Sequence, residues 1–69
     1  MAFTIECEQE EDGRWIAEVL ELPGVLAYGQ THQTAISKVQ SLARRVLTEQ
    51  FKHWERHWPV IGITFTTPP

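Results

Sequence analysis

The sequence predicts a small α+β domain with the element order β-β-β-α-β, in which one helix packs on a mainly antiparallel sheet. Three observations predict it. Apolar and polar residues alternate with a period of two over the first third of the chain. Apolar residues then follow helical spacing from about residue 32, and a β-rich run supplies a last strand. The 69 residues have room for one domain, which spans residues 1–69.

The first two predicted strands form a hairpin. Residues 3–8 alternate strictly, and residues 14–20 form a second strand after a turn at residues 11–13. A three-residue loop pairs Cys7 with Ala17 across the hairpin. That register places the apolar residues of both strands on one face, whereas a one-residue slip would send one set to the other face.

A turn, a third strand and a helix follow. Residues 22–24 carry Leu-Pro-Gly and predict a tight turn, after which residues 25–28 form a short strand. Thr31 is the expected N-cap of the helix. The apolar positions of that helix are Ala35, Ile36, Val39, Leu42, Ala43, Val46 and Leu47.

The end of the helix is open to two interpretations. Apolar helical spacing continues to Trp58, just before Pro59. A helix over residues 32–58 would be about 39 Å long, whereas the predicted last strand, residues 60–66, would be about 23 Å long. Either the helix ends near Gln50 and the strand returns to its own sheet, or the strand joins the sheet of a partner. We expect the first.

Charge is distributed unevenly along the chain. The net charge is −3, but residues 1–21 hold seven acidic residues and one basic residue, whereas the remainder holds two acidic and five basic residues. An acidic segment repels nucleic acid and attracts basic proteins. The alternative is a solvated face that keeps the protein in solution.

The hairpin register brings acids together on the face away from the helix. Glu6 lies opposite Glu18, and Glu8 lies opposite Ile16. Like charges across a strand pair destabilise by some tenths of a kcal/mol, so this face suits the Lys or Arg of a partner. The expected partner-binding residues, from this face and the hairpin, are Glu6, Glu8, Glu10, Glu11, Asp12, Ile16, Glu18 and Leu20.

Catalytic and metal-binding alternatives are weaker. A nuclease of the ribonuclease H type needs several carboxylates around two metal ions, and no third acid is placed to join Glu6 and Glu18. Glu49, His53 and His57 would line one helix face and could bind a metal ion there. The same spacing is typical of a polar stripe that faces solvent. Cys7 alternates inward and reads as a small apolar thiol. We therefore expect no catalytic residues, no metal site and no cofactor.

A longer pattern resembles a known family. Residues 12–24 read Asp-Gly-Arg-Trp-Ile-Ala-Glu-Val-Leu-Glu-Leu-Pro-Gly, and residues 29–31 read Gly-Gln-Thr before Ala35. This ordered set is similar to that of the HicB family of antitoxins, from residue 3 to about residue 50. The chain departs from the family at three positions, with Leu20 in place of a Pro, Val25 in place of a Cys and Thr34 in place of an acidic residue.

The resemblance implies the antitoxin of a type II toxin–antitoxin system, which binds and neutralises a small basic HicA-like toxin that cleaves RNA. It also implies a fold similar to a truncated ribonuclease H-like core without catalytic activity. Because the sequence shows no helix-turn-helix or ribbon-helix-helix segment after this domain, we expect no direct binding of nucleic acid. The alternative is an orphan scaffold module that self-associates and has no toxin partner.

Size and cysteine content set two further expectations. Cys7 is the only cysteine, which fits a reducing, cytoplasmic location, and no stretch approaches the roughly 20 apolar residues of a membrane helix. A chain this short buries only about 60% of its unfolded surface, so its stability is modest. We therefore expect a homo-oligomer, a dimer or larger, in which association adds stability.

Overall fold

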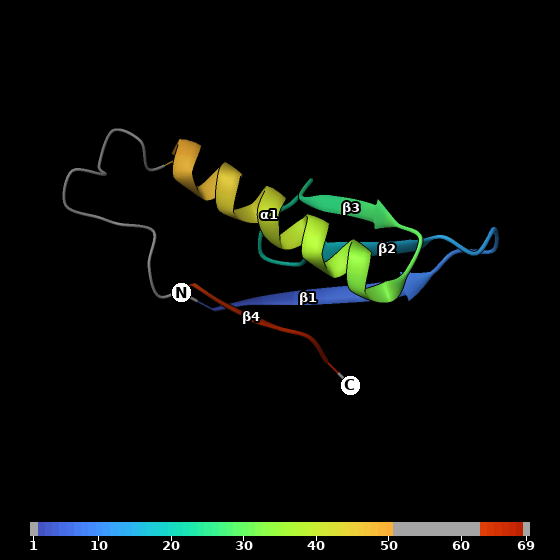
Figure 1. Ribbon diagram of the computed structural model, residues 1–69. Helices are drawn as coiled ribbons and strands as arrows, with labels where there is room; N and C mark the ends of the chain where they lie inside the picture. Colours follow the sequence, from blue (N-terminus) through green and yellow to red (C-terminus); the bar gives the residue numbers. More distant parts are fainter. Residues whose placement is uncertain (1, 51–62, 69) are drawn as a thin grey trace.

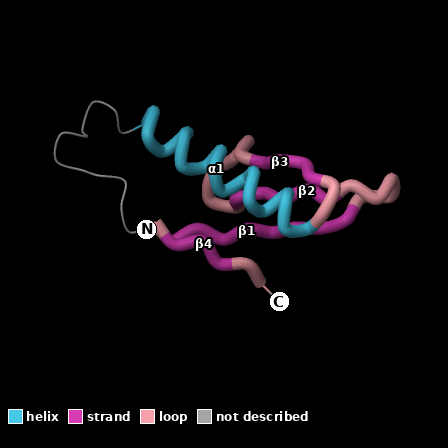
Figure 2. Tube along the Cα trace, viewed as in Figure 1, coloured by secondary structure: helices cyan, strands magenta, loops and turns pink. Residues whose placement is uncertain are grey.

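The computed structural model describes residues 2–50 and 63–68. Its strands form one four-stranded mixed sheet in the order β3-β2-β1-β4, and the helix lies across one face of that sheet (Figures 1 and 2). The α+β class and the order β-β-β-α-β are therefore confirmed. The elements are β1 (Ala2–Gln9), β2 (Trp15–Val19), β3 (Leu26–Gly29), α1 (His32–Gln50) and β4 (Thr64–Thr66).

The β1–β2 hairpin has the predicted register, with Cys7 paired to Ala17. The Glu10 N–H donates to the Arg14 carbonyl at 2.6 Å, which closes a loop of three residues. Gly13 ends that loop with a φ of 94°, a conformation that L side chains rarely adopt. A short loop with glycine at its last position therefore sets the register of the whole hairpin.

The turn between β2 and β3 also forms as expected, with Gly24 at a φ of 88°. The Val25 N–H donates to the Leu22 carbonyl at 3.0 Å. Because that N–H serves the turn, β3 begins at Leu26, one residue later than predicted, and ends at Gly29.

The last strand joins the sheet of its own chain. β4 pairs in parallel with β1, Phe3 opposite Phe65, and the two phenyl rings lie 6.1 Å apart. This agrees with the expected alternative in which the strand returns to its own sheet. The predicted strand was longer: Ile63 precedes the strand, and residues 60–62 lie outside the described part of the chain.

The start of α1 is held by a threonine cap, as predicted. The Thr34 N–H donates to the Thr31 Oγ1 at 3.0 Å, and the Thr31 hydroxyl donates to the Thr34 Oγ1 at 2.7 Å. Gly29 lets this first turn approach β3, because a Cβ there would lie 2.5 Å from the Ala35 nitrogen. The alternative continuation of the helix to Trp58 falls on residues 51–58, which lie outside the described part of the chain.

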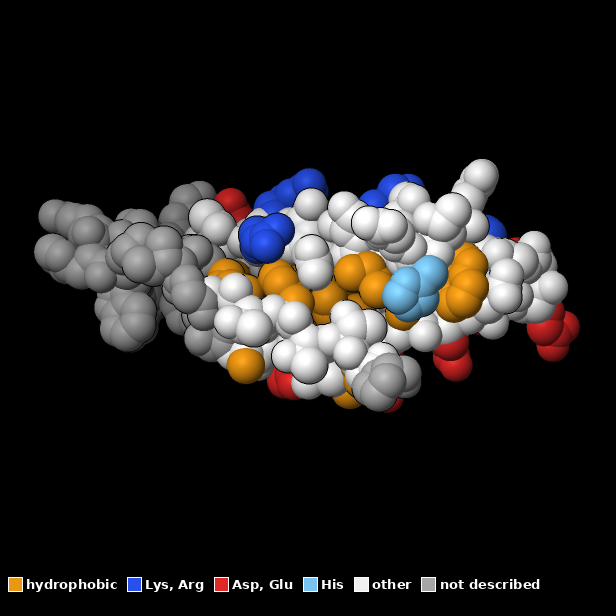
Figure 3. Space-filling view, turned by 60° about the horizontal axis from the view of Figure 1, so that its bottom comes forward, with side chains coloured by type: hydrophobic (Ala, Val, Ile, Leu, Met, Phe, Trp, Pro, Cys, Tyr) orange, Lys and Arg blue, Asp and Glu red, His pale blue; other side chains and the backbone are white. Residues whose placement is uncertain are grey.

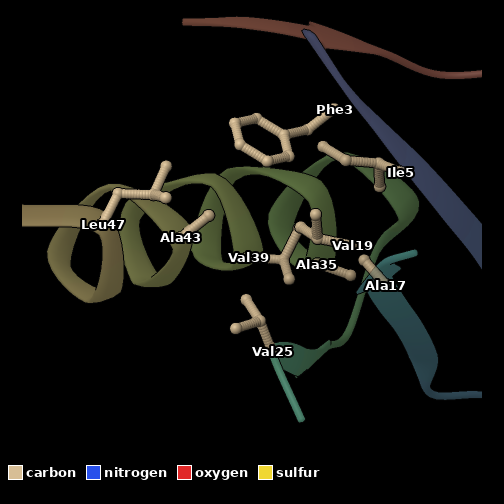
Figure 4. Packing of buried hydrophobic residues seen from close by; sticks show 9 residues of the cluster. All are labelled: Phe3, Ile5, Ala17, Val19, Val25, Ala35, Val39, Ala43 and Leu47. Atoms are coloured by element: carbon tan, nitrogen blue, oxygen red, sulfur yellow. The ribbon is translucent and has the colours of Figure 1, made fainter. Parts of the chain in front are cut away.

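The core lies between α1 and the inner face of the sheet (Figure 4). Side chains from β1 and β2 point toward one side of the helix, and Val39 lies among them. As predicted, the apolar residues of the two hairpin strands share one face, which packs under the helix with Cys7 half-buried at its margin. The buried residues are Phe3, Ile5, Ala17, Val19, Val25, Ala35, Val39, Ala43 and Leu47.

Candidate functional site

The face of the sheet opposite α1 is covered by no element among the described residues (Figure 1). We call it the outer face. Strand pairing arranges its side chains in cross-strand rows, because partners in an antiparallel ladder point to the same side. The outer face consists of Thr4, Glu6, Glu8, Ile16, Glu18, Leu20, Leu26 and Tyr28.

The β1 side of the outer face is acidic. Glu6 stands directly opposite Glu18, and Glu8 stands opposite Ile16, as the sequence predicted. Glu6 and Glu8 are exposed and Glu18 is half-buried. Partners in such a ladder have Cα atoms about 4.5–5.5 Å apart, so the two carboxylates repel each other when no cation lies between them.

The β3 side of the outer face is apolar. Leu20 is 45% exposed, and Leu26 and Tyr28 are each 39% exposed. These are the exposed large hydrophobic residues of the described chain, and all three lie on the outer face. Leu26 and Tyr28 lie on β3, Tyr28 opposite half-buried Ile16, whereas Leu20 follows β2 and its N–H donates to the Thr4 carbonyl of β1. Exposed apolar residues that gather on one surface mark a site of interaction.

Sequence reasoning found Ile16 and Leu20 but missed Leu26 and Tyr28. Val25 and Ala27 alternate with them and pack inward, but an alternation this short does not show from the sequence which set faces the helix. Their position on the outer face follows from the pairing of Tyr28 with Ile16.

The hairpin tip is held by its own charges. The Asp12 Oδ1 accepts from the Arg14 N–H at 3.1 Å, and its Oδ2 pairs with the Arg14 Nε at 2.8 Å. The backbone hydrogen bond from Arg14 lowers the pKa of Asp12 below its ordinary value. Asp12 therefore holds the turn, and Glu10 and Glu11 accompany it at the end of the hairpin, away from the row of Glu6.

Arg14 also connects the tip to the apolar side. Its guanidinium carbon lies 4.6 Å from the centroid of the Tyr28 ring, within the range of a cation–π contact. The one basic residue of the first third of the chain is thus engaged with Asp12 and Tyr28 rather than with Glu6 or Glu18.

Glu21 has a structural role that the sequence did not reveal. Its Oε1 accepts a hydrogen bond from the Thr4 N–H at 2.7 Å, across 17 residues of chain. That bond lowers the pKa of Glu21 below its ordinary value, because it favours the charged carboxylate. Glu21 thereby ties the loop after β2 to β1 at one end of the outer face.

Apart from Arg14 at the hairpin and Glu49 on α1, the basic and acidic side chains of the described chain lie in different parts of the molecule (Figure 3). Figure 3 shows Lys and Arg side chains along the helix side, a band of hydrophobic side chains in the middle, and most Asp and Glu side chains on the opposite margin. The basic residues of α1 are Lys38, Arg44 and Arg45, and Arg44 lies over the Phe65 ring at 5.3 Å. A basic partner would therefore meet least repulsion on the outer face.

A shallow depression lies beside β1 at the end of β4. It has a volume of about 260 Å³ and is lined by Glu6, Cys7, Glu8, His32, Thr67 and Pro68. Partial burial raises the pKa of the Cys7 thiol, whose Sγ is 4.0 Å from the His32 carbonyl oxygen. The His32 ring meets Trp15 edge-on at 5.2 Å. These contacts pack the start of α1 against the sheet.

Among the residues that the structure describes, no three His, Cys, Asp or Glu side chains lie close enough together to hold a metal ion. Of the helical stripe considered above, Glu49 is described, whereas His53 and His57 lie outside the described residues. In the described part of the chain, no helix is both long and apolar enough to cross a membrane.

No protein-family model, curated protein or solved structure matches the chain. The interpretation of the outer face therefore depends on its own geometry, together with the HicB-like pattern of residues 12–24.

Proposed function

We propose that this chain is a binding module whose outer face holds a small basic protein, and that this protein is a HicA-like RNA-cleaving toxin. The observation that carries the proposal is the composition of the outer face. Glu6 and Glu8 lie on β1 with Glu18 beside them on β2, exposed Leu26 and Tyr28 lie on β3, and exposed Leu20 follows β2. No described element covers this face (Figure 1). The identity of the toxin comes from the HicB-like pattern alone.

The acidic side of the outer face would attract the partner. Glu6, Glu8 and Glu18 create a negative field that speeds the approach of a basic surface and orients it. A Lys or Arg placed between Glu6 and Glu18 would also remove their mutual repulsion. Binding is therefore favoured in part because it relieves a cost that the free chain carries.

The apolar side would hold the partner once it has arrived. Leu20, Leu26 and Tyr28 offer exposed surface whose burial stabilises a complex by roughly 25 cal/mol per Å² before the costs of association. Aromatic residues such as Tyr28 are enriched at the centres of interfaces. An RNA-binding surface covered in this way could no longer reach its substrate, so neutralisation needs no catalysis by this chain.

Capture of the partner tests the proposal. The full-length chain, tagged, is recovered from its native cells, and co-eluting proteins are identified by mass spectrometry. We expect a small basic protein at close to one copy per chain, and we expect the purified protein to cleave RNA only when this chain is absent. Recovery of the chain by itself would contradict the proposal and favour the orphan self-associating scaffold.

A further inference from the structure

The sheet is open at its β3 end. β3 pairs with β2 on one side, and no described strand lies on its other side. The Val19 N–H donates to the Val25 carbonyl at 3.0 Å, and hydrogen-bonded and non-hydrogen-bonded pairs alternate from there. The N–H and C=O groups of Leu26 and Tyr28 therefore point away from β2, toward the open side.

This edge lacks the features that keep edge strands apart. Proteins guard exposed strand edges with charged residues, proline or bulges. Residues 25–30 contain no charged residue and no proline. The opposite end of the sheet differs, because β4 has three residues and is soon followed by Pro68.

We infer that β3 pairs antiparallel with β3 of a second copy of this chain, about a two-fold axis at Ala27. Leu26 of each copy then lies opposite Tyr28 of the other copy. Both positions direct their backbone groups outward, so each pair exchanges two hydrogen bonds and the seam gains about four. The same patch serves both copies, as a two-fold interface requires.

The side chains suit this seam. Leu26 and Tyr28 are equally exposed, and each would gain an aromatic–aliphatic neighbour across the seam on the outer face. Ala27 lies on the two-fold axis, and its side chain is small enough to face Ala27 of the second copy on the inner side of the sheet. The apolar sides of the two outer faces would then merge into one patch.

Charge favours this edge over the other ways in which two copies could meet. β4 covers only Ala2, Phe3 and Thr4 of β1, so a second copy could also pair with the remainder of that strand. Such pairing would place Glu6 and Glu8 beside Glu6 and Glu8 of the second copy. Packing the outer faces together would also bring Glu18 against acids. In the β3 seam, by contrast, strand spacing puts the nearest acids, the two Glu18 residues, about 16 Å apart, beyond the Debye length of about 8 Å at physiological salt.

The dimer would have one continuous sheet with both outer faces on the same side. It would thus present two equivalent acidic surfaces, whatever partner they bind. The inference stands on the β3 edge and holds even if the proposed toxin does not exist.

The test compares the mass in solution of the full-length wild type with that of Leu26→Pro, by light scattering over a wide range of concentration. Proline removes the outward N–H of Leu26 and leaves the bonds to β2 intact, which edge strands tolerate. We expect a dimer for the wild type and, for Leu26→Pro, a monomer that unfolds cooperatively and melts like the wild type at concentrations where the wild type is monomeric. Leu26→Ala, which keeps the N–H, is the matched control and should still dimerise.

A wild type that stays monomeric at high concentration would overturn the inference, as would a Leu26→Pro variant that dimerises like the wild type. Hydrogen exchange on the wild type gives a second measurement that does not depend on the variant's folding. The amides of Leu26 and Tyr28 should be protected at concentrations where the dimer forms and exchange faster on dilution. Equal exchange at both concentrations, with the dimer present, would also overturn it.

Discussion

The two faces of the sheet differ in character although they belong to the same strands. On the inner face, Ile5, Ala17 and Val19 are fully buried beneath α1. On the outer face, their immediate neighbours Glu6, Glu18 and Leu20 remain at least partly exposed. Because side chains alternate along a strand, one residue serves the fold and the next is free to serve binding. Stability and binding should therefore respond to different substitutions.

The sharpest contrast is between Ile5→Ala and Leu20→Ala. Ile5 is 0% exposed, so its truncation leaves a cavity and should lower the free energy of unfolding by about 2–5 kcal/mol. Leu20 is 45% exposed, so its truncation should change that free energy by roughly 0.5 kcal/mol or less. Urea unfolding measures both. Equal losses in the free energy of unfolding would show that the outer face stabilises the fold as much as the inner face does.

Gly29→Ala tests how closely the helix must approach the sheet. The added Cβ would lie 2.5 Å from the Ala35 nitrogen, and backbone atoms would have to shift. We expect a loss of about 1–3 kcal/mol in the free energy of unfolding, the usual cost of overpacking. Ala27→Gly changes the neighbourhood of the same strand without adding volume and serves as the comparison. Unchanged stability in Gly29→Ala would mean that α1 can move away from β3 freely.

Low pH should reduce the stability of the folded chain in part through protonation of Glu21. Its pKa is lower in the folded chain than in the unfolded chain, so its contribution is present above the ordinary carboxyl pKa, about 4, and is lost as the pH falls through the folded value. Unfolding measured from pH 7 downward should therefore show a shallower fall for Glu21→Gln than for the wild type. Glu11→Gln makes the same change in net charge. Identical acid profiles for the two variants would contradict a special role of the Thr4 bond.

The smallest effect on stability should come from Glu18→Gln, which should stabilise the fold whereas the substitutions above destabilise it. Removing one of two facing carboxylates should raise the free energy of unfolding by a few tenths of a kcal/mol, because the repulsion with Glu6 disappears. Thermal unfolding at low salt, where charge effects are largest, measures it. A clear loss of stability would show that Glu18 supports the fold rather than the binding surface.

The hairpin could be predicted because its information is local. A three-residue loop ending in glycine and strict alternation in both strands fix one register, and that register places Glu6 opposite Glu18. The helix cap could be predicted for the same reason, since Thr31 and Thr34 are three residues apart.

Long-range features could not be predicted in the same way. The bond between Thr4 and Glu21 and the contact between Phe3 and Phe65 join distant segments, and no local pattern announces either. Leu26 and Tyr28 were missed for a different reason. A strand of four residues carries too short an alternation to orient it, and its facing depends on its pairing with β2.

The most direct measurement is the affinity of the basic partner, by calorimetry, for the double variant Glu6→Gln/Glu18→Gln. The control is Ser37→Lys/Ser41→Lys, which makes the same change in net charge on exposed positions of α1. We expect the first variant to bind at least tenfold more weakly, about 1.4 kcal/mol, and the second to bind nearly as the wild type does. Equal affinities for all three chains would contradict binding through the outer face.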